Sequence, residues 1–111
     1  DEVTVVHIDV TEGPHKGKSL ELRPKPNTPC MVGRSAGKKF RERGVSLAKD
    51  TEVSTTHGRI EIICGCAYFT DLGSTNGTIH QNQMLESNRP YKLYEGMELV
   101  LGGSHLKIRL E

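Results

Sequence analysis

Apolar residues alternate with polar ones in short segments along the whole chain. Val6, Ile8 and Val10 form one such segment near the N-terminus, and residues 106–110 repeat the pattern near the C-terminus. A period of two residues gives an extended chain one apolar face and one polar face, which is typical of a half-buried β-strand. Turn residues separate the segments. The sequence therefore predicts an all-β fold, an antiparallel β-sandwich of about ten short strands.

The other expected strands are short. They cover residues 20–22, 30–34, 45–47, 59–64, 67–72, 78–80 and 99–101. Residues 35–44 are polar and basic, have glycines at their flanks and show no apolar face, so we expect a loop there and no substantial helix anywhere. The first and last strands are expected to pair side by side.

Size and charge limit the possible classes of protein. At 111 residues, we expect a single domain covering 1–111, excised from a longer protein because the chain begins with Asp1. The net charge of +1, from 15 basic and 14 acidic residues, argues against binding through bulk nucleic-acid electrostatics. No apolar run approaches the roughly 20 residues of a membrane span, so we expect no membrane contact and no signal peptide.

The three cysteines favour a reducing compartment. Cys30, Cys64 and Cys66 are an odd number, whereas an oxidised framework uses pairs. We therefore expect an intracellular protein with free thiols. Cys64 and Cys66 flank an expected hairpin turn, but a metal there would need further ligands at suitable spacing, and only scattered histidines are available. We expect no metal.

Two polar loops flank the expected hairpin of residues 59–64 and 67–72. An antiparallel pair returns the chain to where it began, so both loops are expected at the same end of a sheet, together with Arg34. Hydroxyl donors around one arginine, without an acid or a set of metal ligands, suit an oxyanion with several acceptors, and a phosphate fits best. The loops supply the side chains of Ser54, Thr55, Thr75 and Asn76.

A serine, a histidine and an aspartate in these loops raise the alternative of a hydrolase. Ser54 and His57 are three residues apart on a tight loop, a spacing that does not let them face each other. No Gly-x-Ser-x-Gly elbow and no oxyanion hole accompanies them or Asp71. We expect no enzyme, and we interpret His57 as a structural histidine that braces its loop.

The segment 34–43 raises the alternative of nucleic-acid binding. Its basic side chains suit a solvated loop or electrostatic steering toward an acidic phosphopeptide. A nucleic-acid platform would also need interleaved aromatic residues, and Phe40 alone is nearby. The basic cluster consists of Lys38, Lys39, Arg41 and Arg43.

With these residues in view, the chain resembles the forkhead-associated (FHA) domain family over essentially its whole length. The resemblance rests on Gly33-Arg34, on Ser54-Thr55-Thr56-His57 as the Ser-x-x-His element, and on residues 71–78 as the Asn-Gly loop. Three elements in this order, on an all-β pattern, are specific to the family. The resemblance implies an eleven-stranded β-sandwich whose loops at one end bind phosphothreonine peptides.

The resemblance also assigns roles to individual residues. Arg34 would hold the phosphate, with Ser54 and Thr55 beside it. Thr75 would add a donor near the phosphothreonine, and Asn76 would hydrogen-bond the peptide main chain.

Three further residues would support the site without touching the ligand. Gly33 and His57 occupy motif positions that maintain the loop architecture, and Gly77 completes an Asn-Gly turn that needs a positive φ. The sequence departs from some family members at Glu52, where they carry a basic residue that reads the peptide after the phosphothreonine. An acid at this position favours a basic flanking residue instead.

The sequence thus predicts a non-catalytic, phosphothreonine-dependent module that binds a partner protein in intracellular signalling. It predicts no cofactor and no small-molecule substrate, and the resemblance places the nucleus ahead of the cytoplasm. Two alternatives stay open: a phosphate-independent interaction domain on the same fold, and a nucleic-acid binder using residues 34–43.

Overall fold

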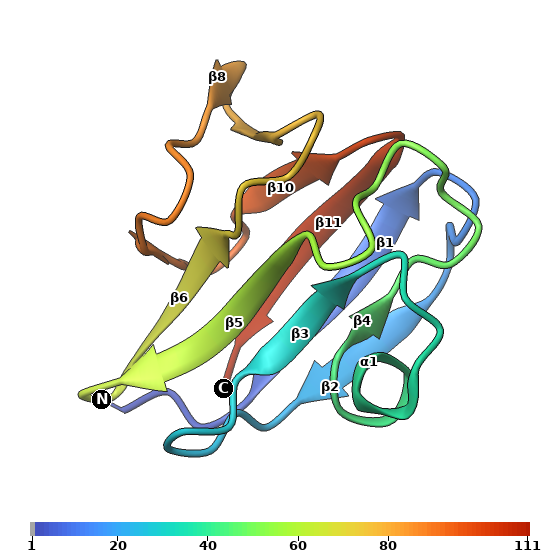
Figure 1. Cartoon of the computed structure of the whole chain (residues 1–111). Helices are drawn as coiled ribbons and strands as arrows, with labels where there is room; N and C mark the ends of the chain where they lie inside the picture. Colours follow the sequence, from blue (N-terminus) through green and yellow to red (C-terminus); the bar gives the residue numbers. More distant parts are fainter. Residues whose placement is uncertain (1) are drawn as a thin grey trace.

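The computed structural model describes residues 2–111, which form two packed β-sheets and one short helix (Figure 1). Within these residues the elements are, in order, β1 (Val6–Glu12), β2 (Ser19–Leu22), β3 (Cys30–Gly33), α1 (Lys38–Arg43), β4 (Val45–Ser46), β5 (Gly58–Ile63), β6 (Cys66–Asp71), β7 (Thr78–His80), β8 (Gln83–Met84), β9 (Tyr91–Lys92), β10 (Glu98–Leu101) and β11 (Ser104–Leu110). The described residues contain no helix long and apolar enough to cross a membrane.

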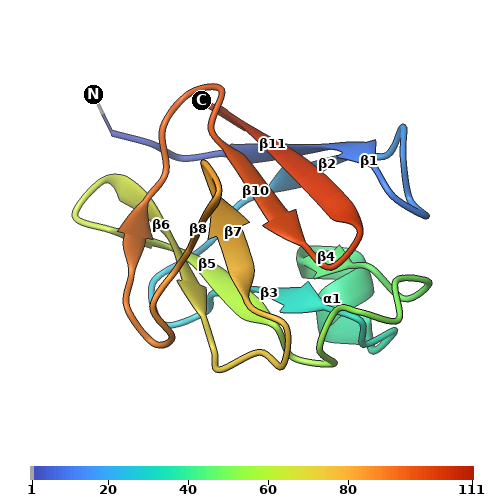
Figure 2. The same ribbon diagram turned by 90° about the horizontal axis from the view of Figure 1, so that it is seen from above.

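The two sheets form the layers of a sandwich, which confirms the predicted fold class. One sheet has the strand order β2-β1-β11-β10-β7-β8, and the other has the order β4-β3-β5-β6-β9. Figure 2 shows β1, β10 and β11 in one layer and β3 and β5 in the other. Neighbouring strands are antiparallel except for β3 and β4, which pair in parallel.

The terminal strands pair side by side, as their patterns predict. Val6 on β1 lies opposite Leu110 on β11, and the register continues to Val10 opposite Leu106 before a bulge interrupts it. The start of β1 and the end of β11 therefore lie next to each other at one end of the sandwich.

The alternating apolar residues face the interior between the sheets. Ile8 and Ile108 from one sheet and Ile60 and Phe69 from the other are each at most 1% exposed. Burying a side chain of this size contributes about 1.5–3 kcal/mol to the free energy of unfolding. This core is the rigid scaffold that holds the loops at its ends.

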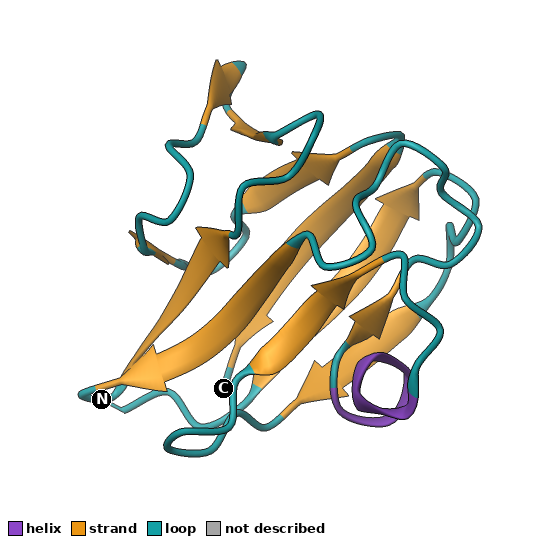
Figure 3. Ribbon diagram, viewed as in Figure 1, coloured by secondary structure: helices purple, strands orange, loops and turns teal. Residues whose placement is uncertain are grey.

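Residues 35–44 are not simply a loop, because α1 covers Lys38–Arg43, the one purple element in Figure 3. Phe40 anchors the helix with 9% of its surface exposed. Gly44 lets the chain pass close to β3, since a Cβ there would lie 2.1 Å from the backbone oxygen of Met31. The predicted loop was wrong because one buried aromatic residue in a helix of six residues gives no apolar period.

Two short edge strands, β8 and β9, were also not predicted. Each has two residues, and neither carries the apolar alternation that indicates a strand. The turn between β7 and β8 has positive φ at Gln81 and Asn82, and this backbone conformation reverses the direction of the chain where a turn was expected.

Candidate functional site

The two polar loops lie at the same end of the sandwich and are hydrogen-bonded to each other. The backbone N–H of Thr75 donates to the Ser54 hydroxyl oxygen at 3.0 Å, and the Asn76 side-chain amide donates to the Glu52 carbonyl at 2.9 Å. In Figure 1 the loop between β4 and β5 passes beside the end of β3 and the turn between β10 and β11. The predicted convergence of the loops is therefore present in the structure.

Arg34 follows the last residue of β3 and lies against the first of these loops. Its Nε donates to the Val53 carbonyl at 3.0 Å, and its Nη2 donates to the Thr55 hydroxyl oxygen at 3.2 Å. Its backbone N–H donates to the Ser54 carbonyl at 2.9 Å. Within residues 2–111, Nη1 makes no hydrogen bond, so part of the exposed guanidinium is free to receive a ligand.

Gly33 allows the end of β3 to approach this loop closely. A Cβ at Gly33 would lie 2.2 Å from the Thr55 carbonyl oxygen, which is backbone and cannot rotate away. The same carbonyl accepts the backbone N–H of Ser35 at 3.1 Å. Any side chain at this position would therefore separate Arg34 from the loop that orients it.

His57 is fully buried and joins the two loops. Its Nδ1 accepts the backbone N–H of Ser54 at 3.1 Å, so the ring proton lies on Nε2. This nitrogen lies 3.1 Å from the Gly77 carbonyl and 3.1 Å from the Thr78 hydroxyl. Burial lowers the pKa of the ring below its ordinary value, although the Asp71 carboxylate 3.5 Å away opposes that shift. The ring is therefore neutral at pH 7.

Asp71 shapes the second loop, a role that the sequence analysis did not assign. Oδ1 accepts the backbone N–H groups of Gly73 and Ser74 at 2.9 and 2.8 Å, and Oδ2 accepts the hydroxyls of Ser74 and Thr78, each at 2.7 Å. Burial alone would raise the pKa of Asp71, but these hydrogen bonds hold it below its ordinary value. The pattern Asp-x-Gly-Ser is typical of an Asx turn and was the available signal.

The loop then closes at Gly77. Its backbone N–H donates to the Ser74 hydroxyl oxygen at 3.0 Å, and its φ of +80° lies in the region that favours glycine. This positive φ agrees with the predicted Asn-Gly turn.

Asp50 is a second structural carboxylate that sequence reasoning missed. Its side chain is buried, and Oδ2 accepts the Gly103 backbone N–H at 3.0 Å and the Ser104 hydroxyl at 2.6 Å. Oδ1 accepts the backbone N–H of Glu52 at 3.1 Å. Asp50 thus fixes the first loop to the turn between β10 and β11 on the other sheet.

The hydrogen bonds do not form the relay of a serine hydrolase. His57 Nδ1 accepts from the backbone of Ser54, and the Ser54 hydroxyl accepts from Thr75. Within residues 2–111, neither ring nitrogen of His57 contacts the Ser54 hydroxyl. In this arrangement the histidine cannot take a proton from that hydroxyl.

The remaining donors point to what the loops can bind. The Ser54 and Thr55 oxygens each accept one hydrogen bond, which leaves their hydroxyl protons free to donate. Arg34, Thr55, Thr75 and Asn76 are exposed, and Ser54 is half-buried. One guanidinium with several hydroxyl donors is a set suited to a tetrahedral oxyanion.

Comparison with known proteins shows the family of the chain. The family model of the FHA domain matches residues 30–102, well over half of the chain. The chain belongs to the FHA domain family. The matched segment begins at β3 and includes Arg34 and both polar loops, while β1, β2 and all of β11 lie outside it.

Relatives of this FHA domain include a curated FHA domain-containing protein of Arabidopsis thaliana. The two are 36% identical over 92 residues, which cover 82% of this chain and 22% of that protein. The chain thus spans about a fifth of the length of this relative.

Solved FHA domains have the same fold across nearly the whole chain. The FHA domain of an Arabidopsis thaliana hypothetical protein is 28% identical, with a TM-score of 0.83 over 97% of this chain and 86% of that one. A domain from a structural and functional analysis of phosphothreonine-dependent FHA interactions is also 28% identical, with a TM-score of 0.75 over 97% of this chain and 98% of that one. The terminal strands outside the family match are therefore part of the shared fold.

Proposed function

We propose that this FHA domain is a non-catalytic module that binds a partner protein through a phosphothreonine in an extended segment. The proposal rests mainly on the position of Arg34, which Val53 and Thr55 hold in place while Nη1 makes no hydrogen bond to any of the described residues 2–111. A solved relative at 28% identity takes part in phosphothreonine-dependent interactions, which supports the proposal.

Arg34 supplies the charge for this recognition. A phosphothreonine carries about −1.5 to −2 charges at pH 7 and three strong acceptor oxygens. The guanidinium donates from a planar fork, and the hydroxyls of Ser54 and Thr55 add neutral donors beside it. All three side chains already take part in hydrogen bonds within the site, so little side-chain entropy is lost on binding.

Thr75 and Asn76 extend the contact from the phosphate to the peptide. One amide hydrogen of Asn76 is used by the Glu52 carbonyl, which leaves its second hydrogen and its oxygen for the peptide main chain. Thr75 is fixed through its backbone N–H to Ser54, and its exposed hydroxyl is available beside the phosphothreonine.

Preference for phosphothreonine over phosphoserine requires an apolar contact with one additional methyl group. Full burial of a methyl-sized group is worth about 0.8 kcal/mol, which gives a preference of only a few-fold. A larger preference would require the methyl group to restrict the rotamers of the bound peptide as well.

The hydrogen bonds of His57 and Asp71 support a module without catalysis. Both ring nitrogens of His57 and both carboxylate oxygens of Asp71 are used to hold the loops. No cofactor or small-molecule substrate enters this mechanism.

We also propose an intracellular location, with the nucleus ahead of the cytoplasm. The exposed thiol of Cys64 and the half-buried thiol of Cys66 support a reducing compartment, since both are free.

The test compares three synthetic peptides that differ only at the central residue: phosphothreonine, threonine and phosphoserine. Their flanking residues are taken from an oriented phosphothreonine peptide library. Isothermal titration calorimetry should give measurable affinity for the phosphothreonine peptide, a few-fold weaker affinity for phosphoserine and none for threonine. Equal affinity for the threonine peptide would instead identify a phosphate-independent interaction domain. If single-stranded or duplex DNA binds at low salt more tightly than the phosphothreonine peptide does, the domain is a nucleic-acid binder.

A further inference from the structure

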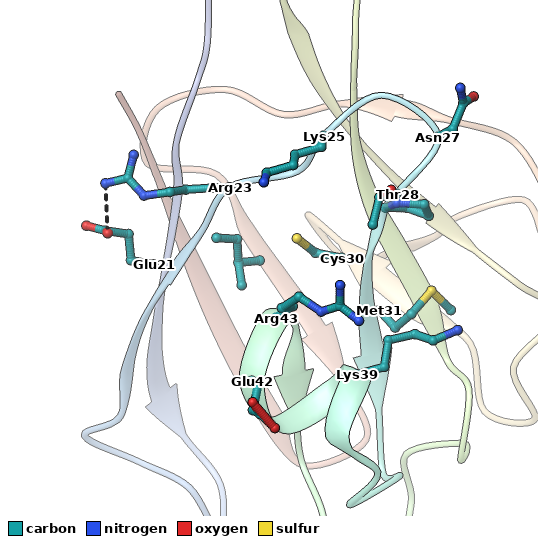
Figure 4. A pocket seen from close by; sticks show the side chains of 12 residues that line it. Glu21, Arg23, Lys25, Asn27, Thr28, Cys30, Met31, Lys39, Glu42 and Arg43 are labelled. Carbon is teal, nitrogen blue, oxygen red and sulfur yellow. Dashed lines mark hydrogen bonds and ion pairs between the residues drawn. The ribbon is translucent and has the colours of Figure 1, made fainter.

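A hollow lies between the segment 21–31 and α1, away from the polar loops (Figure 4). Its volume is about 430 Å³, and none of its lining residues belongs to the proposed phosphothreonine site. Cys30 lies at this hollow, at the first residue of β3, whereas Arg34 follows the last residue of the same strand. At about 3.3 Å per residue, the two positions are roughly 13 Å apart along the strand.

The floor of this hollow is apolar. Leu22 and Cys30 are only 3% and 4% exposed, and the half-buried Met31 and Pro29 complete the lining around them. Burial raises the pKa of the Cys30 thiol, so the floor carries no charge at pH 7.

The rim of the hollow has a net positive charge, because its lining includes four cationic side chains and the two carboxylates of Glu21 and Glu42. Lys25 comes from the loop after β2, while Lys39 and Arg43 come from one face of α1 at a spacing of four residues. Figure 4 shows Lys25 and Arg43 reaching toward the centre from opposite sides, with Cys30 between them.

Three of the four cations make no ion pair within residues 2–111, although Glu42 at the same rim offsets part of their charge. Within residues 2–111, no carboxylate lies within 4 Å of Lys25, Lys39 or Arg43, whereas Arg23 pairs with Glu21 at 2.9 Å. Because the whole chain has a net charge of only +1, the positive charge is a local feature and not a general excess. We call this hollow with its apolar floor and basic rim the basic pocket.

We propose that the basic pocket is a second docking site, which binds an acidic, unphosphorylated segment of a partner protein. An apolar side chain of that segment lies on the floor at Leu22 and Cys30, and flanking carboxylates meet the cations of the rim. The volume lies within the roughly 300–1,000 Å³ of ligand pockets. The lining contains no aromatic ring on which a nucleobase could stack, which favours a peptide over a nucleic acid.

The test uses nuclear magnetic resonance of the ¹⁵N-labelled chain with the peptide acetyl-Glu-Glu-Leu-Glu-Glu-amide as the probe. The peptide should shift the amide signals of Leu22, Cys30 and Met31, while those of Ser54 and Asn76 stay in place. The variant Arg34→Ala should bind this probe like the unmodified chain, because the basic pocket acts without Arg34. Failure of the phosphothreonine site would therefore leave this result unchanged.

Charge reversal at the rim tests the role of the cations. The double variant Lys39→Glu/Arg43→Glu should bind the probe at least about tenfold more weakly. Lys25→Glu, on a different element, should weaken it in the same direction. The matched control Lys92→Glu/Lys107→Glu makes the same change of charge at exposed positions elsewhere and should leave affinity within about twofold.

Four results would overturn the proposal. They are the absence of shifts at the basic pocket, equal binding of acetyl-Gln-Gln-Leu-Gln-Gln-amide, equal weakening by the control pair, and stronger shifts at the same amides with adenosine triphosphate. Thermal melting shows whether each variant is folded. If Lys39→Glu/Arg43→Glu is unfolded, the affinity of Lys25→Glu alone decides the role of the cations.

Discussion

Asn76 illustrates how a single side chain can both close a loop and contact a ligand. Its side-chain amide donates to the Glu52 carbonyl, which joins the two loops, and the rest of the carboxamide is exposed. Because this contact is at the surface, its loss affects the site more than the fold.

We expect Asn76→Ala to weaken phosphothreonine-peptide binding by about tenfold, the value of roughly one or two hydrogen bonds. Its free energy of unfolding should change by less than about 1 kcal/mol. Calorimetry and urea unfolding measure the two quantities, with Gln83→Ala on the exposed β8 as the control. If binding is unchanged, Asn76 is a turn residue alone.

A second prediction concerns the buried His57. Its pKa is lowered by burial, so the unfolded chain binds a proton more readily than the folded chain. The stability from neutral His57 is complete above about pH 6.5 and decreases as the pH falls from there toward the lowered pKa, by up to about 1.4 kcal/mol per pH unit.

Urea unfolding between pH 7.5 and 5 measures this loss. His15 also has a lowered pKa, caused first by burial, so the measurement is repeated on His15→Gln. A constant free energy of unfolding in that variant would contradict the assignment of a neutral, hydrogen-bonded His57. Asp71 changes the free energy of unfolding only at a lower, more acidic pH, because its pKa is lowered from an already low ordinary value.

At the scale of the elements, the end of β3 and the first polar loop are in direct backbone contact. Gly33→Ala places a methyl group 2.2 Å from the Thr55 carbonyl, and neither backbone can rotate away. We expect this variant to lose about 1–3 kcal/mol of unfolding free energy and most of its phosphothreonine affinity.

The control for this prediction is Gly37→Ala. Gly37 has a φ of −64°, and its Cβ would meet only the flexible Ser35 side chain, at 3.2 Å. Melting temperature and peptide affinity of both variants are compared. An alanine tolerated equally well at both positions would show that the close approach at Gly33 is not needed.

The elements also show what sequence reasoning could predict. The long strands β1, β5, β6 and β11 were predicted because each packs one face on the core, which imposes a period of two. The helix α1 was not predicted. It is stabilised by the contact of Phe40 with the body of the domain, and such a tertiary contact leaves no pattern along the chain.

At the scale of the whole molecule, the site depends on residues far apart in the sequence. The convergence of Arg34, Ser54 and Thr75 could be predicted, because a hairpin returns its two flanking loops to the same end. The contact of Asp50 with Gly103 and Ser104 could not, since it joins the two sheets and the sequence does not specify which strands face each other.

The charge of the ligand leads to a prediction for the complex as a whole. The second pKa of a phosphothreonine is about 6, so its charge falls from nearly −2 toward −1 as the solution is acidified. We expect peptide affinity to weaken below about pH 6, because Arg34 then meets a less negative phosphate. Calorimetry at a series of pH values checks this, and a flat profile from about pH 7.5 to 5.5 would contradict dianion recognition.

The most direct test of the account is the phosphothreonine-peptide affinity of Arg34→Ala and Arg34→Lys, measured by calorimetry beside the unmodified chain. The account predicts no detectable binding for Arg34→Ala while the variant stays folded, because the exposed Arg34 side chain contributes to stability only through its hydrogen bonds to Val53 and Thr55. It predicts that Arg34→Lys recovers little of the peptide affinity, since an ammonium group cannot reproduce the planar, two-pronged donor geometry of a guanidinium. Unchanged affinity in Arg34→Ala would contradict the central claim.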